Sequence, residues 1–200
     1  VPLPSAQLAL LHGPLMICGF LGTVIGLERA VALGYRWAYA GPLFTGLGGI
    51  ALQLGFPPFA GASAMVLGSA VLFAGTTLIM LRQRELFMVT MVLGAASWLA
   101  GNLLWLTGTG VPGVVPLWMN FLVLTIAGER LELSRFLPPS PAAKQIFTVI
   151  LAMLMTGGIL SGTGAGIVIY GIGLLGLAMW LLRQDIARRT VKGQGLTRFI

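Results

Sequence analysis

Long apolar segments alternate with short polar ones along the chain. Each apolar segment has about 18 to 25 residues, the length of an α-helix that crosses roughly 30 Å of hydrocarbon. Lipid offers no water to the backbone, so such segments fold as helices that satisfy their own hydrogen bonds. The pattern predicts an all-α, polytopic transmembrane bundle of about seven spans, at residues 8–33, 37–54, 60–81, 86–106, 114–133, 142–160 and 165–182.

Composition and charge support a membrane protein. Hydrophobic residues make up 57% of the chain and charged residues 8%, whereas soluble domains have about 25% charged residues. The Lys and Arg residues lie at the connections between spans one and two, three and four, and five and six, or after span seven. By the positive-inside rule this side is cytoplasmic, so we expect the N-terminus outside and the C-terminus inside.

The same distribution predicts location and partners. We expect a protein integral to a cell membrane, the bacterial inner membrane, in contact with the lipid bilayer and with other membrane subunits. Nucleic acid is not an expected partner, because no contiguous basic face with interleaved aromatic residues occurs. The first residues include no initiator Met and no positive region, so either a segment was removed or the sequence begins within a longer chain.

Landmarks recur at an offset of 101 residues, which predicts an internal repeat. Phe20, Ile25, Glu28 and Arg29 fall on Phe121, Ile126, Glu129 and Arg130. The offset covers four spans, an even number, so the copies would be parallel. We divide the chain into a first four-span repeat, residues 1–110, and an incomplete second repeat, residues 111–200, with three spans and a basic tail. The fourth span then lacks a counterpart, which predicts a further span in the natural protein or another subunit in its place.

The first span contains the only histidine. At 100° per residue an α-helix places His12 on a stripe of mostly small residues, which consists of His12, Met16, Gly19, Thr23, Gly26 and Ala30. Such stripes pack helices closely in membranes. They also leave room for a flat ring, so His12 is either a buried hydrogen-bonding residue or an axial ligand of a haem or another porphyrin.

Three amides lie near the outer ends of their spans and predict an outer polar cluster: Gln53, Asn102 and Asn120. Polar groups at membrane depth that face inward mark functional sites by default. Amides also cross-link helices without further chemistry, and the tryptophans at the same depth are typical of the membrane interface: Trp98, Trp105 and Trp118. Both interpretations of the cluster stay open.

Two acid–base pairs lie about one turn inside the cytoplasmic boundary, namely Glu28-Arg29 and Glu129-Arg130. Long side chains at this depth reach water. We interpret both pairs as structural ion pairs that tie span ends to neighbouring loops, with a proton relay or a substrate gate as the alternative.

Catalytic motifs are missing from the sequence. No aspartate lies near the single histidine, so a Ser-His-Asp arrangement cannot form, and the ligand count for zinc is too low. No phosphate-binding or dinucleotide-binding glycine motif occurs in a strand–helix context. We predict no catalytic residues, no independent enzyme activity, and no metal ligand other than His12, for haem iron alone.

The run His12-Gly13-x-x-Met16, followed by Gly19-Phe20 and Ile25-Gly26, resembles the second helix of haem-copper oxidase catalytic subunits. It is also similar to the histidine-bearing helix of the NnrS family, membrane proteins associated with haem, copper and nitric oxide metabolism. The resemblance implies haem b or a related porphyrin on His12, with Met16 as a possible second ligand. It implies no copper site, since those proteins use several histidines.

Three hypotheses for function follow. The first is a haem- or porphyrin-binding, redox-accessory subunit of a membrane complex, with His12 as axial ligand. The second is a cofactor-free structural subunit of a larger membrane complex. The third is a small-solute transporter with a route along the outer amides.

Overall fold

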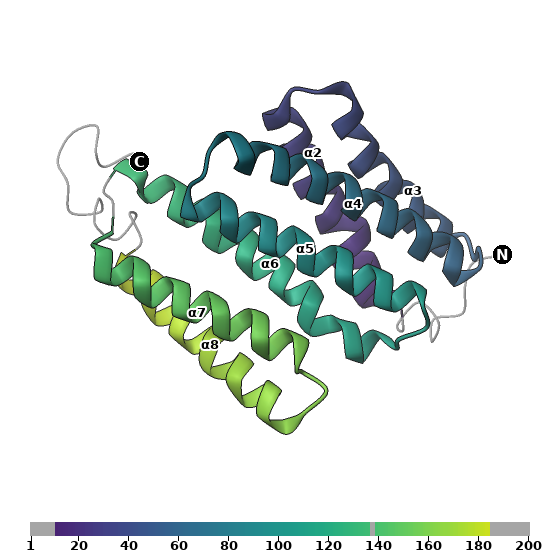
Figure 1. Ribbon diagram of the computed structural model, residues 1–200. Helices are drawn as coiled ribbons and strands as arrows, with labels where there is room; N and C mark the ends of the chain where they lie inside the picture. The colour runs from purple at the N-terminus through teal and green to yellow at the C-terminus, as the bar shows by residue number, and fades with distance from the viewer. Residues whose placement is uncertain (1–10, 137–138, 185–200) are drawn as a thin grey trace.

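The computed structural model describes residues 11–136 and 139–184 (Figure 1). Every regular element in this part of the chain is helical, and no strand occurs in it. A π-helical segment, η1, runs directly into the first α-helix, and two short 3₁₀ turns, η2 and η3, stand beside later helices. The elements are η1 (Pro14–Leu21), α2 (Gly22–Leu33), η2 (Arg36–Tyr39), α3 (Ala40–Gln53), α4 (Pro58–Arg82), α5 (Leu86–Leu106), α6 (Val111–Leu133), η3 (Ser134–Phe136), α7 (Pro141–Ile159) and α8 (Gly164–Gln184).

Helix ends fall where the sequence places turn residues. Gly34 follows α2 with φ of 73° and donates its backbone N–H to Ala30, the left-handed helix end that glycine adopts without steric cost. Gly55, with φ of 81°, ends the turn after α3, and Pro58 begins α4. The seven predicted helices are therefore present, while the predicted start of the first helix, before residue 11, and the basic tail from residue 185 lie outside the described residues.

In the described part of the chain, six helical segments are long and apolar enough to span a membrane, and the second of the seven predicted spans is not among them. The second predicted span, residues 37–54, is divided between η2 and α3, and α3 has 14 residues. Helix α3 alone is about 21 Å long, but η2 runs directly into it, so the continuous helical segment of residues 36–53 is about 29 Å long, close to the roughly 30 Å hydrocarbon layer. The 3₁₀ winding of Arg36–Tyr39 and the turn at Gly55 shorten the α-helix at both ends.

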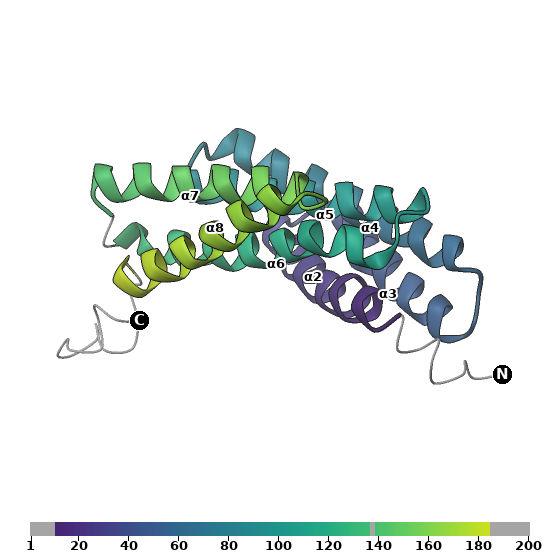
Figure 2. The same ribbon diagram turned by 90° about the horizontal axis from the view of Figure 1, so that it is seen from below.

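Helices α5 and α6 form the centre of the bundle (Figures 1 and 2). The α3–α4 hairpin packs on one side of them together with η1 and α2, and the α7–α8 hairpin packs on the other side. Each side has its own hydrophobic core. One core includes Leu52, Met65 and Trp98, and the other includes Phe87, Phe147 and Trp180. Helices α5 and α6 contribute to both cores and so join the two halves.

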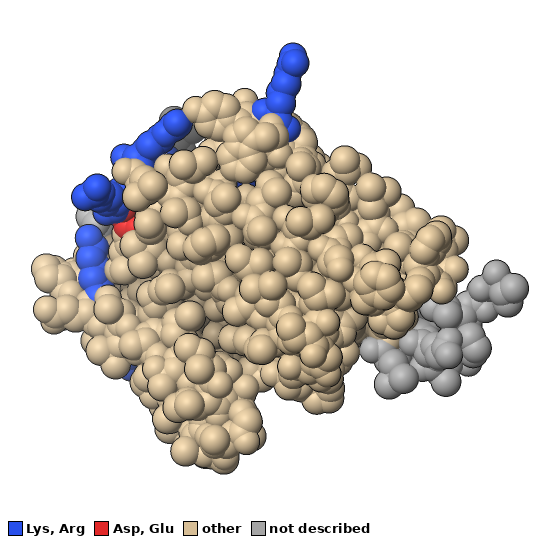
Figure 3. Space-filling view, turned by 45° about the vertical axis from the view of Figure 1, so that its right-hand side comes forward, with Lys and Arg blue, Asp and Glu red and all other residues tan. Residues whose placement is uncertain are grey.

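Basic residues gather at one end of the bundle (Figure 3). The helices alternate in direction, so the ends of α2, α4, α6 and α8 meet the starts of α3, α5 and α7 there (Figure 1). The basic residues of the described part are Arg29, Arg36, Arg82, Arg84, Arg130, Arg135, Lys144 and Arg183. Together with the six candidate spans, this polarity is that of an integral membrane protein.

The predicted repeat stays a prediction. Helices α3–α4 and α7–α8 are corresponding hairpins under the offset of 101, but their turns do not coincide. Gly55, in the turn between α3 and α4, falls on Thr156, which lies inside α7. The second hairpin therefore needs additional residues before its turn if the two halves share an origin.

Candidate functional site

A buried hydrogen-bond network at the end of the bundle away from the basic residues joins four helices. Asn102 on α5 is its centre, and its side-chain oxygen accepts two hydrogen bonds, from Trp118 Nε1 at 2.9 Å and from the Cys18 thiol at 3.3 Å. The Asn102 amide nitrogen donates to the Met65 carbonyl at 3.2 Å. Trp98 Nε1 donates to the Cys18 sulfur at 3.3 Å. We name these five residues the outer network.

Every member of the outer network is fully buried, with a relative exposure of 0% for the whole residue. A buried polar group costs free energy unless it is hydrogen-bonded, and here each side-chain donor has a partner. The elements it connects are η1, α4, α5 and α6. The network therefore fixes the mutual positions of these helices.

An aromatic stack closes the interior beside the outer network. The rings of Trp98 and Phe121 lie parallel, with an interplanar angle of 7° and centroids 4.5 Å apart. Their exposures are 0% and 1%. Gly22 packs directly on the Trp98 indole, where a Cβ would collide with the ring. The stack occupies the centre between α2, α5 and α6.

The predicted stripe on the first helix divides into two faces. Gly19 and Gly26 contact α3, since an added Cβ would lie 3.5 Å from Gly49 Cα and 3.4 Å from Pro42 Cδ, respectively. Thr23 Oγ1 of α2 lies 2.9 Å from Thr45 Oγ1, which also belongs to α3. The small residues therefore serve helix packing.

His12 and Met16 do not continue that stripe, which corrects the sequence prediction. The π-helical winding of η1 bonds residue i to i+5, so it turns less per residue than an α-helix and rotates the preceding residues to another face. His12 is exposed, and Met16 is 43% exposed. Both side chains point away from the small residues that face α3.

A haem does not fit between the helices next to His12. The space beside the small residues, where a flat ring was expected, is occupied by α3. His12 lies on the outer surface of the bundle. Met16 lies on the same exposed face, so it cannot reach the opposite side of a ring bound by His12. In the described part of the chain, no three His, Cys, Asp or Glu side chains come together as metal ligands.

The three predicted amides do not form one cluster. Asn102 belongs to the outer network, while Gln53 is exposed at the end of α3. Asn120 is fully buried and cross-links α6 to α7, because its amide nitrogen donates to the Leu154 carbonyl at 3.2 Å. Its side-chain oxygen has no hydrogen-bond partner. Asn120 is thus a helix cross-link with one unsatisfied atom.

The acid–base residues near the basic end connect α2 to α6. Arg29 donates to Glu129 Oε1 at 3.1 Å, and the carboxylate of Glu28 lies 3.7 Å from the same nitrogen. The Arg29 side chain is 13% exposed and Glu129 is 37% exposed. Beside Arg29 lies a cavity of about 10 Å³ that Thr76 and Thr125 also line, which is room for about one water molecule.

Sequence reasoning found Asn102, Trp98 and Trp118 but not Cys18, the fourth side chain of the outer network. Trp98 and Asn102 are four residues apart on α5, so they share one helical face. The spacing of four residues between two polar groups indicates that this face of α5 packs against another polar group. Cys18 could not be chosen from sequence because its orientation depends on the π-helical winding of η1.

Comparison with curated proteins and with solved structures gave no match. A family model described as a domain of unknown function (DUF8744) matches residues 1–200.

Proposed function

Since the chain belongs to the DUF8744 family, whose description names no activity, we propose from its packing that it is a structural membrane subunit which acts by binding another membrane protein. The observation that carries this proposal is the closed interior. Trp98 and Phe121 stack at the centre, and the buried amide of Asn102 is bonded to three other helices or segments. A transporter needs a route through this region, and a haem needs a slot.

The exposed face of η1 and α2 is the proposed binding surface. It carries an apolar stripe with exposures between 43% and 62%, namely Met16, Phe20, Val24, Leu27 and Val31. His12 lies exposed at one end of the stripe and Glu28, with 58% of its side chain exposed, lies near the other. An apolar stripe with an ionisable group at each end suits a partner helix that crosses the same membrane, because polar side chains form hydrogen bonds between helices in lipid.

A photo-crosslinking amino acid at Val24 tests this proposal, with Leu175 on the exposed face of α8 as the matched control. In membranes of the natural host, we expect Val24 to form one discrete adduct with a membrane protein and Leu175 to label lipid. The proposal is wrong if Val24 labels only lipid and the purified chain takes up solutes in proteoliposomes.

For the orientation, we propose an outer N-terminus and a cytoplasmic C-terminus in the bacterial inner membrane. The support is the collection of basic residues at one end. Arg84→Cys and Arg135→Cys should both react with an impermeant thiol reagent only after the membrane is opened, whereas Thr109→Cys should react in intact cells. Labelling of Arg84→Cys and Arg135→Cys from opposite sides would overturn the topology.

Haem ligation by His12 is a second proposal, and the exposure of His12 favours it in one form. A haem on this face would take its other axial ligand from the partner protein. The complex should then show a Soret band that disappears in His12→Ala, while the isolated chain stays colourless. A colourless complex with intact His12 would exclude haem.

A further inference from the structure

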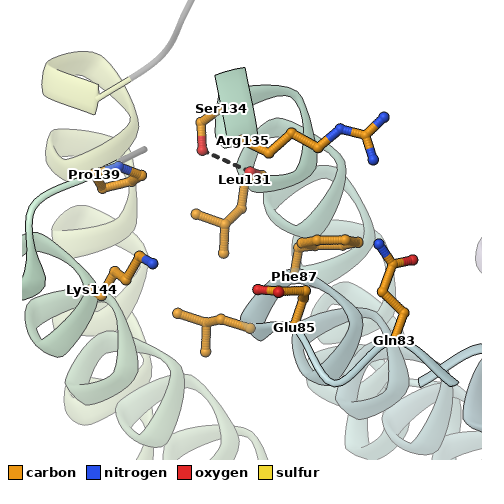
Figure 4. Close-up of a pocket in the computed structure, with 9 residues that line it drawn as sticks. Gln83, Glu85, Phe87, Leu131, Ser134, Arg135, Pro139 and Lys144 are labelled. Carbon is orange, nitrogen blue, oxygen red and sulfur yellow. Dashed lines mark hydrogen bonds between the residues drawn. The ribbon is translucent and has the colours of Figure 1, made fainter. Parts of the chain in front are cut away.

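A cavity of about 260 Å³ lies at the basic end of the bundle (Figure 4). It is bordered by the turn between α4 and α5, the end of α6 and the start of α7. Leu86, Phe87 and Leu131 provide its apolar wall, which continues into the hydrophobic core shared by α5 to α8. The cavity is therefore apolar toward the bundle and polar toward its rim.

Two opposite charges face this cavity from opposite walls. The Lys144 ammonium points into it from α7, and the Glu85 carboxylate points toward it from the residue before α5 (Figure 4). Neither charged group forms an ion pair or side-chain hydrogen bond with another described residue. Arg135 also borders the cavity, but its guanidinium points away from it. Arg135 Nη1 lies 3.9 Å from Glu132 Oε1.

The two charged residues that face the cavity lie at the ends of candidate membrane spans. Lys144 lies in the first turn of α7 and Glu85 immediately precedes α5, and both helices continue as candidate membrane spans. Basic pockets between transmembrane helices at this level bind phospholipid headgroups. The apolar wall below the two charges is where the glyceride and the first acyl carbons of such a lipid would lie.

We propose that this cavity binds the headgroup of a phosphoethanolamine lipid. The phosphate accepts a hydrogen bond from Lys144, and the headgroup ammonium donates to Glu85, so each unpaired charge gains an oppositely charged partner. A phosphoglycerol headgroup offers its negative charge to Lys144 but has no cation for Glu85. A phosphocholine headgroup has a cation without N–H donors, so it cannot hydrogen-bond the carboxylate.

Native mass spectrometry of the full chain tests this assignment, with equal concentrations of phosphatidylethanolamine, phosphatidylglycerol and phosphatidylcholine of matched acyl chains. We expect one retained phosphatidylethanolamine, bound about tenfold more tightly than either of the others, which corresponds to one charge-assisted hydrogen bond. Soluble phosphoethanolamine at the same concentration should not displace it, because it cannot use the apolar wall. Displacement would assign the cavity to a soluble ligand and overturn the lipid proposal.

Two variants separate the two contacts. Glu85→Gln should remove the discrimination between phosphatidylethanolamine and phosphatidylglycerol, whereas Lys144→Gln should weaken the retention of both lipids. Arg84→Gln is the matched control, since Arg84 is exposed beside Glu85 but does not line the cavity. All three positions are at the surface, so circular dichroism should be unchanged. The assignment is wrong if Glu85→Gln leaves the ratio of the two lipids unchanged, or if the natural chain prefers phosphatidylglycerol.

Discussion

Arg29 on α2 binds Glu129 on α6 through a hydrogen bond of 3.1 Å, so the two Glu-Arg pairs of the sequence are joined to each other. The sequence predicted that each pair ties its span to a neighbouring loop. The bond instead connects the first helix to the helix that opens the second half of the chain. Arg29 is largely shielded, with 13% of its side chain exposed, so the contact lies inside the bundle and supports the packing of α2 on α6.

We predict that Glu129→Gln destabilises the protein by about 1 kcal/mol, because Arg29 loses the contact at 3.1 Å but keeps the Glu28 carboxylate at 3.7 Å. Arg29→Gln should cost about 1 to 2 kcal/mol, because it leaves both carboxylates without this cation. The double variant should cost less than the sum of the single variants. Thermal unfolding in detergent measures all three. Arg36→Gln, at an exposed position, is the control and should change little. Additive effects of the two substitutions would show that the bond contributes nothing.

The helices could be predicted from sequence because their ends are local. Gly34, Gly55 and the prolines at 57 and 58 stop or start helices through backbone conformation alone. The short α3 could not be recognised in the same way, because hydropathy does not distinguish a 3₁₀ turn from the first turn of an α-helix. Tyr39 and its neighbours are apolar enough to extend a predicted span, yet α3 begins at Ala40.

The site depended on facts that periodicity does not contain. A stripe drawn at 100° per residue places His12 above Gly19, but the π-helical winding of η1 turns His12 to the surface. Likewise, Gln53 and Asn102 have similar depths in their spans, but one is exposed and the other is fully buried. The depth of a residue along its span follows from the sequence. Whether its side chain points into the bundle or outward depends on which helices pack beside it.

The contact between Gly22 and Trp98 predicts a strong effect of one methyl group. Gly22→Ala places a Cβ against the indole, and overpacking of this kind costs about 1 to 3 kcal/mol. Gly171 on α8 is the matched control, because no atom lies within 4 Å of the position that a Cβ would occupy there. Gly171→Ala should be neutral or stabilise by up to about 1 kcal/mol through helix propensity. Far-UV circular dichroism during thermal unfolding compares the two variants, and equal stabilities would contradict the packing at Trp98.

The loss of stability on replacing each of the three amides should follow the hydrogen bonds that the amide forms. Asn102→Ala leaves the Trp118 N–H and the Cys18 thiol without their acceptor, which should cost about 3 kcal/mol or more. Asn120→Ala loses one bond but also removes an unsatisfied oxygen, so about 1 kcal/mol is expected. Gln53→Ala, at an exposed position, should stay within about 0.5 kcal/mol. A larger loss of stability for Gln53→Ala than for Asn102→Ala would contradict the described packing.

Cys18 gives a direct readout of the outer network, because it is the only cysteine in the chain. Its thiol is fully buried, donates to Asn102 and accepts from Trp98, so a maleimide should not reach it in the folded protein and should label it after unfolding. A Cys18→Ser chain with Gln53→Cys is the control, since the exposed position 53 should react at once. Asn102→Ala should accelerate labelling of Cys18 by loosening the contact between η1 and α5. Reaction of Cys18 in the natural folded chain at the rate of the position 53 control would show that η1 does not hold the thiol inside the bundle.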